Sequence, residues 1–178
     1  MDLRVYDLAA LLVAELSAAL EHTRAGQVDF AVVHPGDMVP QYGCELAAVR
    51  LVTILPVAPK PRCAPEWQIT YEMSVDRCYP TTENNAMPPV AWLDSSVRDQ
   101  LEDAGAMRKA ALCAWPNEQG RLYGTWTPRG PAGGIYGGAM QVTATGICLT
   151  AGCEDGPWGA GIDARIPPFE GDPRHKVV

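Results

Sequence analysis

The sequence lacks any run of about 18 consecutive apolar residues, the length that a membrane-spanning helix requires. Positive charge is also scarce: 14 lysine and arginine residues stand against 21 aspartate and glutamate residues, giving a net charge of −7 over 178 residues. This balance disfavours non-specific binding to the nucleic-acid phosphate backbone, because that contact needs clustered positive charge. The first residues carry neither the basic start nor the small-residue cleavage site of a secretion signal. We therefore expect neither a membrane nor a nucleic-acid sequence as the binding partner.

Histidine is rare, with three residues, and the sequence contains no Cys-x-x-Cys motif. Structural zinc sites usually take their ligands in close pairs, so we expect no metal site. The chain is also larger than the small secreted scaffolds that depend on disulfides, which favours buried free thiols, with room for one bridge. The six cysteines are Cys44, Cys63, Cys78, Cys113, Cys148 and Cys153.

Residues that could carry catalysis are not arranged in a recognisable pattern. No G-x-S-x-G motif is present, His22 lies at the end of a predicted helix, and His34 precedes the turn signal Pro35-Gly36. The glycines within residues 130–138 are followed by neither the lysine nor the helix of a phosphate-binding loop. They predict a wide turn in which glycine adopts positive φ. We expect no catalytic residue and no cofactor site, so the protein is predicted not to be an enzyme.

Apolar periodicity predicts two helices and four or five strands. In chain order these elements lie at residues 3–23, 28–34, 44–57, 67–78, 89–113, 122–126 and 138–145. The order favours an α+β fold, an antiparallel sheet of about four strands with two α-helices packed on one face. Apolar periodicity stops at Gly146. The sequence therefore predicts a body at residues 1–146 and an extended C-terminal arm at residues 147–178.

Three elements allow finer predictions. In residues 44–57 the side chains that would point to either face of a strand are largely apolar, which predicts an interior strand covered on both sides. Residues 67–78 alternate cleanly, which predicts a half-buried antiparallel strand. In the second helix we expect Trp92 to pack in the core. The polar residues expected to face solvent there are Asp99, Glu102, Asp103, Arg108 and Lys109.

Two segments are unable to form a core. The first is predicted to be a long hairpin connection or a protruding arm, and the second either lies on a neighbour or stays mobile; our hypothesis is that both make inter-subunit contacts. The proline-rich stretch at residues 56–65 can be neither a helix nor a central strand. The arm carries large apolar residues without periodicity, as expected of anchors for a neighbour. The residues predicted to make these inter-subunit contacts are Pro59, Pro61, Trp158, Ile166 and Phe169.

Five short segments together resemble a known family. In order, they are Tyr42-Gly-Cys44-Glu-Leu46, a proline-rich stretch with Cys63, Asp76-Arg77-Cys78-Tyr79-Pro80, Pro88-Pro89 before the second helix, and Gly130-Pro131-Ala-Gly133-Gly134-Ile-Tyr-Gly137-Gly138. Over residues 1–146 their order and spacing resemble the small virion proteins of long-tailed actinobacterial phages (siphophages). Within that group the chain is similar to the tail-terminator proteins.

The resemblance implies a structural protein that forms a ring, a homohexamer, with copies of itself. Such a ring caps the tail tube, contacts the major tail tube protein, and joins the tail to the head-side stopper or connector. It further implies a place in the tail or neck of the virion, after assembly in the host cytoplasm, with DNA passing through the ring lumen. No cofactor is implied.

The resemblance also bears on the cysteines. The family pattern has two adjacent cysteines where this chain has Gly43-Cys44, and a cysteine where it has Ile135. Cys44, Cys63 and Cys78 match the remaining family positions. One bridge among these three would clip the proline-rich connection.

Two other classes stay open. A head–tail stopper or another connector ring is usually a small β-barrel, so two helices on one sheet would favour the terminator. An enzyme or small-ligand domain would instead require a deep pocket lined by His34, Cys44 and a carboxylate.

Overall fold

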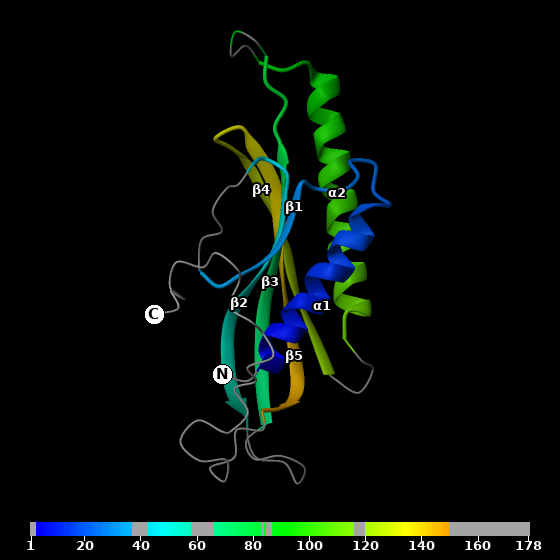
Figure 1. The fold of residues 1–178 in the computed structure, drawn as a ribbon. Coiled ribbons are helices and arrows are strands. Elements are labelled where there is room, and N and C mark those ends of the chain that lie inside the picture. The colour runs from blue at the N-terminus through cyan, green and yellow to red at the C-terminus, as the bar shows by residue number, and fades with distance from the viewer. Residues whose placement is uncertain are drawn as a thin grey trace, which may run out of the picture.

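In the computed structural model, residues 3–36, 43–57, 66–82, 84, 87–115 and 120–149 are described. They form an α+β fold in which helices α1 (Leu3–Leu20) and α2 (Val90–Cys113) pack on one face of a five-stranded sheet (Figure 1). The strand order is β1-β2-β3-β5-β4. The strands span Phe30–His34 (β1), Leu46–Val57 (β2), Glu66–Cys78 (β3), Gly120–Ala132 (β4) and Ile135–Cys148 (β5).

The predicted fold class is confirmed, with two differences in the sheet. It has five strands rather than about four, and it is mixed, because β1 pairs parallel with β2 while the other pairs are antiparallel. The residue pattern of a strand of five residues carries no signal for the direction of its partner. For that reason the parallel pair escaped the sequence analysis.

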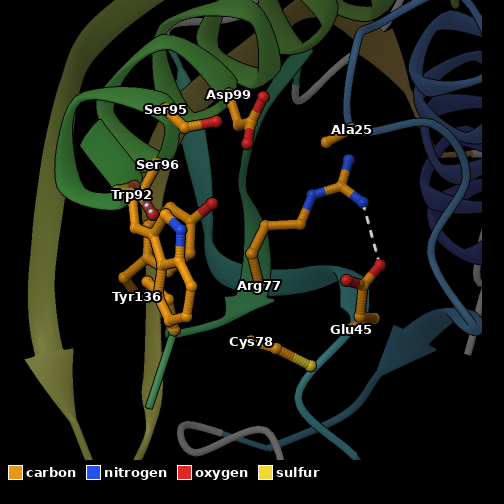
Figure 2. Close-up of a pocket in the computed structure, with 10 residues that line it drawn as sticks. Ala25, Glu45, Arg77, Cys78, Trp92, Ser95, Ser96, Asp99 and Tyr136 are labelled. Carbon is orange, nitrogen blue, oxygen red and sulfur yellow. Dashed lines mark hydrogen bonds and ion pairs between the residues drawn. The ribbon is translucent and has the colours of Figure 1, made fainter. Parts of the chain in front are cut away.

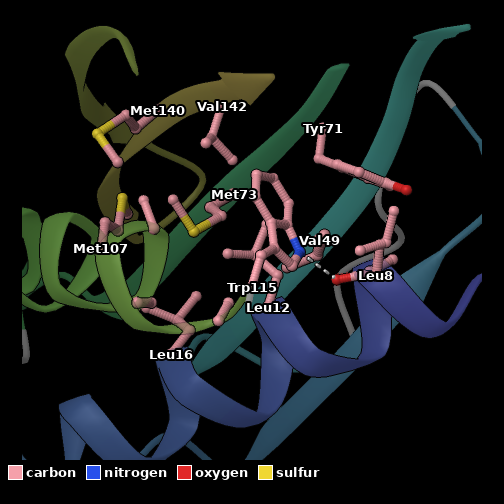
Figure 3. Packing of buried hydrophobic residues seen from close by; sticks show 14 of the residues in the cluster. Leu8, Leu12, Leu16, Val49, Tyr71, Met73, Met107, Trp115, Met140 and Val142 are labelled. Carbon is pink, nitrogen blue, oxygen red and sulfur yellow. Dashed lines mark hydrogen bonds between the residues drawn. The ribbon is translucent and has the colours of Figure 1, made fainter. Parts of the chain in front are cut away.

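The core lies between the helices and the sheet (Figure 3). Leu8, Leu12 and Leu16 form the buried stripe of α1, as their helical spacing predicts. Two polar atoms in this core are satisfied by the backbone of α1: the Tyr71 hydroxyl donates to the Val5 carbonyl at 2.7 Å, and Trp115 Nε1 donates to the Leu8 carbonyl at 3.0 Å. These bonds fix the first two turns of α1 over the centre of the sheet.

Helix α2 is buried only in its C-terminal half. Small residues there allow close packing against α1; the buried residues are Asp103, Ala104, Ala106, Met107, Ala110 and Ala111. Two predictions for this helix are wrong. Trp92 is 48% exposed rather than packed in the core, and Asp103 is buried rather than solvated. Both errors arise because the core-facing direction of α2 is set by α1 and the sheet, not by the helix's own apolar stripe.

Strand β3 is the central strand, and its predicted alternation holds from Ile69 to Met73; the prediction of a half-buried strand is wrong from Ser74 to Arg77, where every residue is buried. Ile69, Tyr71 and Met73 face the helices, and β3 pairs antiparallel with both β2 and β5. Strand β2 was predicted to be covered on both sides, and this prediction is wrong for the second half of the strand. In β2 the first four residues are buried, but Thr53–Pro56 are exposed. The end of the sheet formed by the end of β2 and the start of β3 extends past both helices (Figure 1).

Strands β4 and β5 form a long hairpin closed by Gly133 and Gly134. Their φ angles are 62° and 81°, as the glycine pattern predicts, although the turn is a tight two-residue turn rather than a wide one. Strand β4 is an edge strand, which permits Pro128 and Pro131 within it. Strand β5 continues to Cys148 with Ile147 buried. The body therefore includes two residues that the sequence assigned to the arm.

Of the two segments predicted to make inter-subunit contacts, residues 58–65 and 150–178 fall outside the described residues, whereas Pro56 and Val57 form the end of β2. Residues 58–65 include Pro59 and Pro61, and residues 150–178 include Trp158, Ile166 and Phe169. Within the described ranges, neither helix has the length and hydropathy needed to span a membrane.

Candidate functional site

A cavity of about 350 Å³ opens at the end of the sheet where β3 ends and α2 begins (Figure 2). Its walls come from five parts of the chain: the α1–β1 connection, the residues before β2, the end of β3, the first turns of α2 and the start of β5. The lining residues are Ala25, Glu45, Arg77, Cys78, Pro80, Trp92, Ser95, Ser96, Asp99 and Tyr136.

The floor of the cavity is the fully buried side chain of Arg77. Its Nε and Nη2 donate to the two carboxylate oxygens of Asp103, at 3.0 and 2.9 Å. Its Nη1 donates to Glu45 Oε2 at 3.0 Å and to the Gln27 carbonyl at 3.4 Å. Its Nη2 also donates to the Gly26 carbonyl at 2.8 Å. All five donors of the guanidinium are engaged, so it joins β3, α2, the α1–β1 connection and the entry to β2.

The electrostatics of this group favour a permanent charge. Burial alone lowers the pKa of Arg77, but the hydrogen bonds and negative charges of Asp103 and Glu45 raise it, and the net pKa lies above the ordinary value. A buried ion pair of this kind does not stabilise by its mere presence. It makes each partner indispensable, because removal of one leaves an uncompensated buried charge.

A second arginine fixes the α1–β1 connection to the exposed side of α2. The Arg24 backbone N–H donates to Glu102 Oε2 at 2.6 Å, and its Nε donates to Asp99 Oδ1 at 2.9 Å. Its Nη2 donates to the Ser95 hydroxyl at 2.7 Å and to the Ser95 carbonyl at 2.8 Å. The upper wall of the cavity is thus held by four contacts from one side chain and its amide.

A disulfide between Cys44 and Cys78 closes the cavity from below, with a Cα–Cα distance of 4.7 Å. It links the residues just before β2 to the last residue of β3, next to Arg77. Cys148 is also disulfide-bonded, whereas Cys113 is free and exposed. The expectation of buried free thiols is therefore wrong for the cysteines that the structure describes. Cys63 and Cys153 lie outside the described residues.

The remaining wall is aromatic. Tyr136 and Tyr79 pack edge to face, with ring centroids 6.3 Å apart, and the half-exposed ring of Trp92 stands beside Tyr136 (Figure 2). Burial is the main cause that raises the pKa of Tyr136. The carboxylates of Asp99 and Asp103 add to the increase, while a hydrogen bond with Ser96 opposes it. Tyr136 therefore stays a neutral, hydrogen-bonding ring over the physiological range.

This arrangement is suited to binding rather than to covalent chemistry. Arg77 has no donor left for an anion, and the hydroxyls that line the cavity bond locally: Ser95 accepts from Arg24, and Ser96 donates to the Trp92 carbonyl. His34 lies elsewhere, where its Nδ1 accepts from the Gly36 amide at 3.0 Å. Among the residues that the structure describes, no three side chains are grouped so as to hold a metal ion.

The sequence analysis missed the Arg77–Asp103 pair, although a signal for it exists. The alternation that places Ile69, Tyr71 and Met73 on the helix-facing side of β3 continues through Val75 to Arg77. A charged residue on the buried side of a strand requires a partner of opposite charge. Of the predicted cysteine sites, the structure brings Cys44 and Cys78 together.

No protein-family model matches this sequence, and no curated protein does so either.

Proposed function

We propose that this chain is a structural virion subunit similar to a phage tail terminator. In this proposal, copies of the chain close into a ring, a hexamer by the family resemblance. The ring caps the tail tube and joins it to the head-side connector in the neck of the virion. DNA passes through its lumen, and no reaction is catalysed. The observation that carries the proposal is a line of exposed apolar side chains on α2 that the described residues leave uncovered.

That surface follows one line along the solvent side of α2. Val90 is 80% exposed, Val97 is 53% exposed and Leu101 is 58% exposed. The spacing of seven and then four residues places the three side chains one above the other on the helix. The exposed Asp94, paired with Arg98, separates Val90 from Val97 on this line. Large exposed apolar patches are rare on monomeric proteins and mark contact surfaces. We interpret this stripe as a contact with another protein subunit.

A second exposed surface lies on a different part of the fold. Strand β4 forms one edge of the sheet, and its Leu122 and Tyr123 are exposed. A head-to-tail interface joins two unlike surfaces of identical subunits and closes into a ring when the rotation between them permits. The stripe of α2 and the edge of β4 are two such unlike surfaces on one body.

The fold also bears on the two alternatives. A stopper or other connector ring is expected to be a small β-barrel, whereas this sheet is open and carries both helices on one face, which favours the terminator. For an enzyme or a small-ligand domain we expected a pocket that combines His34, Cys44 and a carboxylate. The cavity described above is not lined by His34, and the sulfur of Cys44 is held in a disulfide.

The native mass of the purified full-length chain tests the proposal. Mass photometry and negative-stain electron microscopy should show particles near six times the chain mass of 19.1 kDa, with a central opening. Incubated with purified tail tubes, a gold-labelled chain should mark one end of each tube. A chain that stays monomeric at all concentrations and binds no tube end would overturn the proposal.

A further inference from the structure

The cavity beside Arg77 has two properties that together define an occupant. One wall is aromatic, formed by Trp92 and Tyr136. Two carboxylates also line the cavity: that of Glu45, just before β2, and that of Asp99, two helical turns after Trp92 on the same face of α2. Such a site fits an extended, proline-rich peptide with basic residues, because proline rings pack on aromatic side chains while flanking cations pair with carboxylates.

Around the cavity, negatively charged side chains outnumber positively charged ones. The cluster contains four carboxylates and two guanidinium groups: those of Glu45, Asp99, Glu102 and Asp103, and those of Arg24 and Arg77. Arg77 occupies Oε2 of Glu45, and no described residue donates a hydrogen bond to Oε1. The side chain of Glu45 also remains 30% exposed. A basic group entering the cavity would therefore meet an accessible carboxylate oxygen.

The chain itself contains a segment with the required chemistry. Residues 58–65 read Ala-Pro-Lys-Pro-Arg-Cys-Ala-Pro, with Lys60 between two prolines and Arg62 directly after the second. This alternation of proline and cation favours the polyproline II conformation, which loses little entropy when it binds. The same stretch was predicted from the sequence to contact a neighbouring subunit through Pro59 and Pro61.

The segment cannot fill the cavity of its own subunit. It leaves β2 at Val57 and re-enters β3 at Glu66, two residues that pair across the sheet. The cavity lies at the opposite end of β3, beside Cys78, and a strand of 13 residues is roughly 40 Å long. Eight residues anchored at both ends reach out at most about 16 Å. Only a second copy of the chain can supply the segment.

We propose that residues 58–65 of one subunit dock in the aromatic and acidic cavity of the next, with Lys60 and Arg62 directed at Glu45 and Asp99. This inference rests on the proposed ring and specifies one of its interfaces. Because the segment and the cavity lie at opposite ends of the same body, the contact is head-to-tail and repeats from subunit to subunit.

Two variants test the contact from its two sides. The double variant Lys60→Glu/Arg62→Glu reverses the charge of the segment, and Trp92→Ala removes the aromatic wall from an exposed position. Each should weaken self-association about 30-fold or more, as expected for the loss of an interface anchor or the juxtaposition of like charges. The control is Lys109→Glu, which reverses a charge at an exposed position of α2 about a quarter turn away from the line of Val90, Val97 and Leu101, and it should leave assembly unaltered.

A mixing experiment gives the decisive result. The Lys60→Glu/Arg62→Glu chain keeps an intact cavity and the Trp92→Ala chain keeps an intact segment, so one productive junction forms between them and propagates no further. Analytical ultracentrifugation of the equimolar mixture should show a heterodimer where each variant alone is monomeric. Circular dichroism of each variant checks that it is folded.

The outcomes separate this inference from the proposed function. Rings of the Lys60→Glu/Arg62→Glu variant with unchanged stability would overturn the docking while leaving the ring intact. Two monomeric variants that fail to form a heterodimer would overturn the docking as well. A wild-type chain without self-association would refute the ring itself. In that case, calorimetry with a synthetic peptide of residues 57–66, in which serine replaces cysteine, tests binding to the cavity. No binding of that peptide at millimolar concentration would refute the docking independently.

Discussion

The substitution Asp103→Ala should be among the most destabilising in the chain. It removes both acceptors from the Arg77 guanidinium, bonds of 3.0 and 2.9 Å, while Arg77 remains in a position where only 2% of its side chain is exposed. Glu45 and the two backbone carbonyls cannot replace a bidentate carboxylate. Breaking a buried ion pair from one side costs about 3–5 kcal/mol. For a chain of this length that loss lowers Tm by roughly 6–20 °C.

The assay is thermal and urea unfolding at neutral pH, followed by circular dichroism. The matched control is Asp94→Ala, which breaks an exposed i,i+4 pair between Asp94 and Arg98 on the same helix. That pair should contribute no more than about 0.5 kcal/mol, because both side chains are solvated. A difference of several kcal/mol between two Asp→Ala substitutions on α2 isolates the effect of burial from that of helix propensity.

The double variant Arg77→Met/Asp103→Leu refines the test. Once both charges are gone, the uncompensated buried charge is gone too, so the double variant should unfold at a higher temperature than Asp103→Ala alone. An Asp103→Ala loss below about 1 kcal/mol would refute the reasoning, since it would mean that water or another group reaches the guanidinium. A double variant less stable than Asp103→Ala would show that leaving Glu45 and the two carbonyls without Arg77 costs more free energy than leaving Arg77 without Asp103.

Three further predictions concern other parts of the body. Cys44→Ala/Cys78→Ala should cost about 4 kcal/mol in the free energy of unfolding, because the disulfide closes a loop with a sequence separation of 34, and urea titration of the oxidised proteins measures this. The free energy of unfolding should fall as pH rises above 10, because burial keeps the pKa of Tyr71 above its ordinary value of 10.0 and the unfolded chain therefore releases this proton first. Tyr71→Phe should flatten this dependence on pH, and an unchanged slope would contradict its attribution to Tyr71. A chain ending at Leu149 should be more stable than one ending at Gly146, which lacks the buried Ile147, and both should assemble less well than the full chain if the arm contacts neighbours. Equal melting temperatures of the two truncations would contradict the boundary at the end of β5.

The sequence predicted those features that depend on local pattern. The leucine spacing of α1, the alternation of β3 and the positive φ of Gly133 and Gly134 all follow from residues within a few positions of one another. It did not predict features that depend on which distant element lies opposite. Asp103 was assigned to solvent by composition, and only the approach of β3 to α2 makes it the partner of Arg77.

Helix α2 shows why a single apolar stripe can be misleading. Its helical apolar pattern includes Val90, Val97 and Leu101, yet these residues are exposed and the buried side of the helix is lined mainly by alanines. Alanines permit the closest approach to α1, and this close packing, rather than the larger residues, sets the orientation of the helix. None of the described residues covers these three side chains.

The fully hydrogen-bonded guanidinium of Arg77 also explains how a subunit of this size can hold an ordered cavity at one end. Five chain segments meet there, and each is fixed by a hydrogen bond to Arg77 or Arg24, by the Cys44–Cys78 disulfide, or by packing of Tyr136. A cavity whose walls are already ordered loses little conformational entropy when a segment of a neighbour enters. The buried ion pair should therefore affect assembly as well as stability. Asp103→Ala should weaken self-association even at temperatures where the variant remains folded, because it loosens the two segments that carry Glu45 and Asp99.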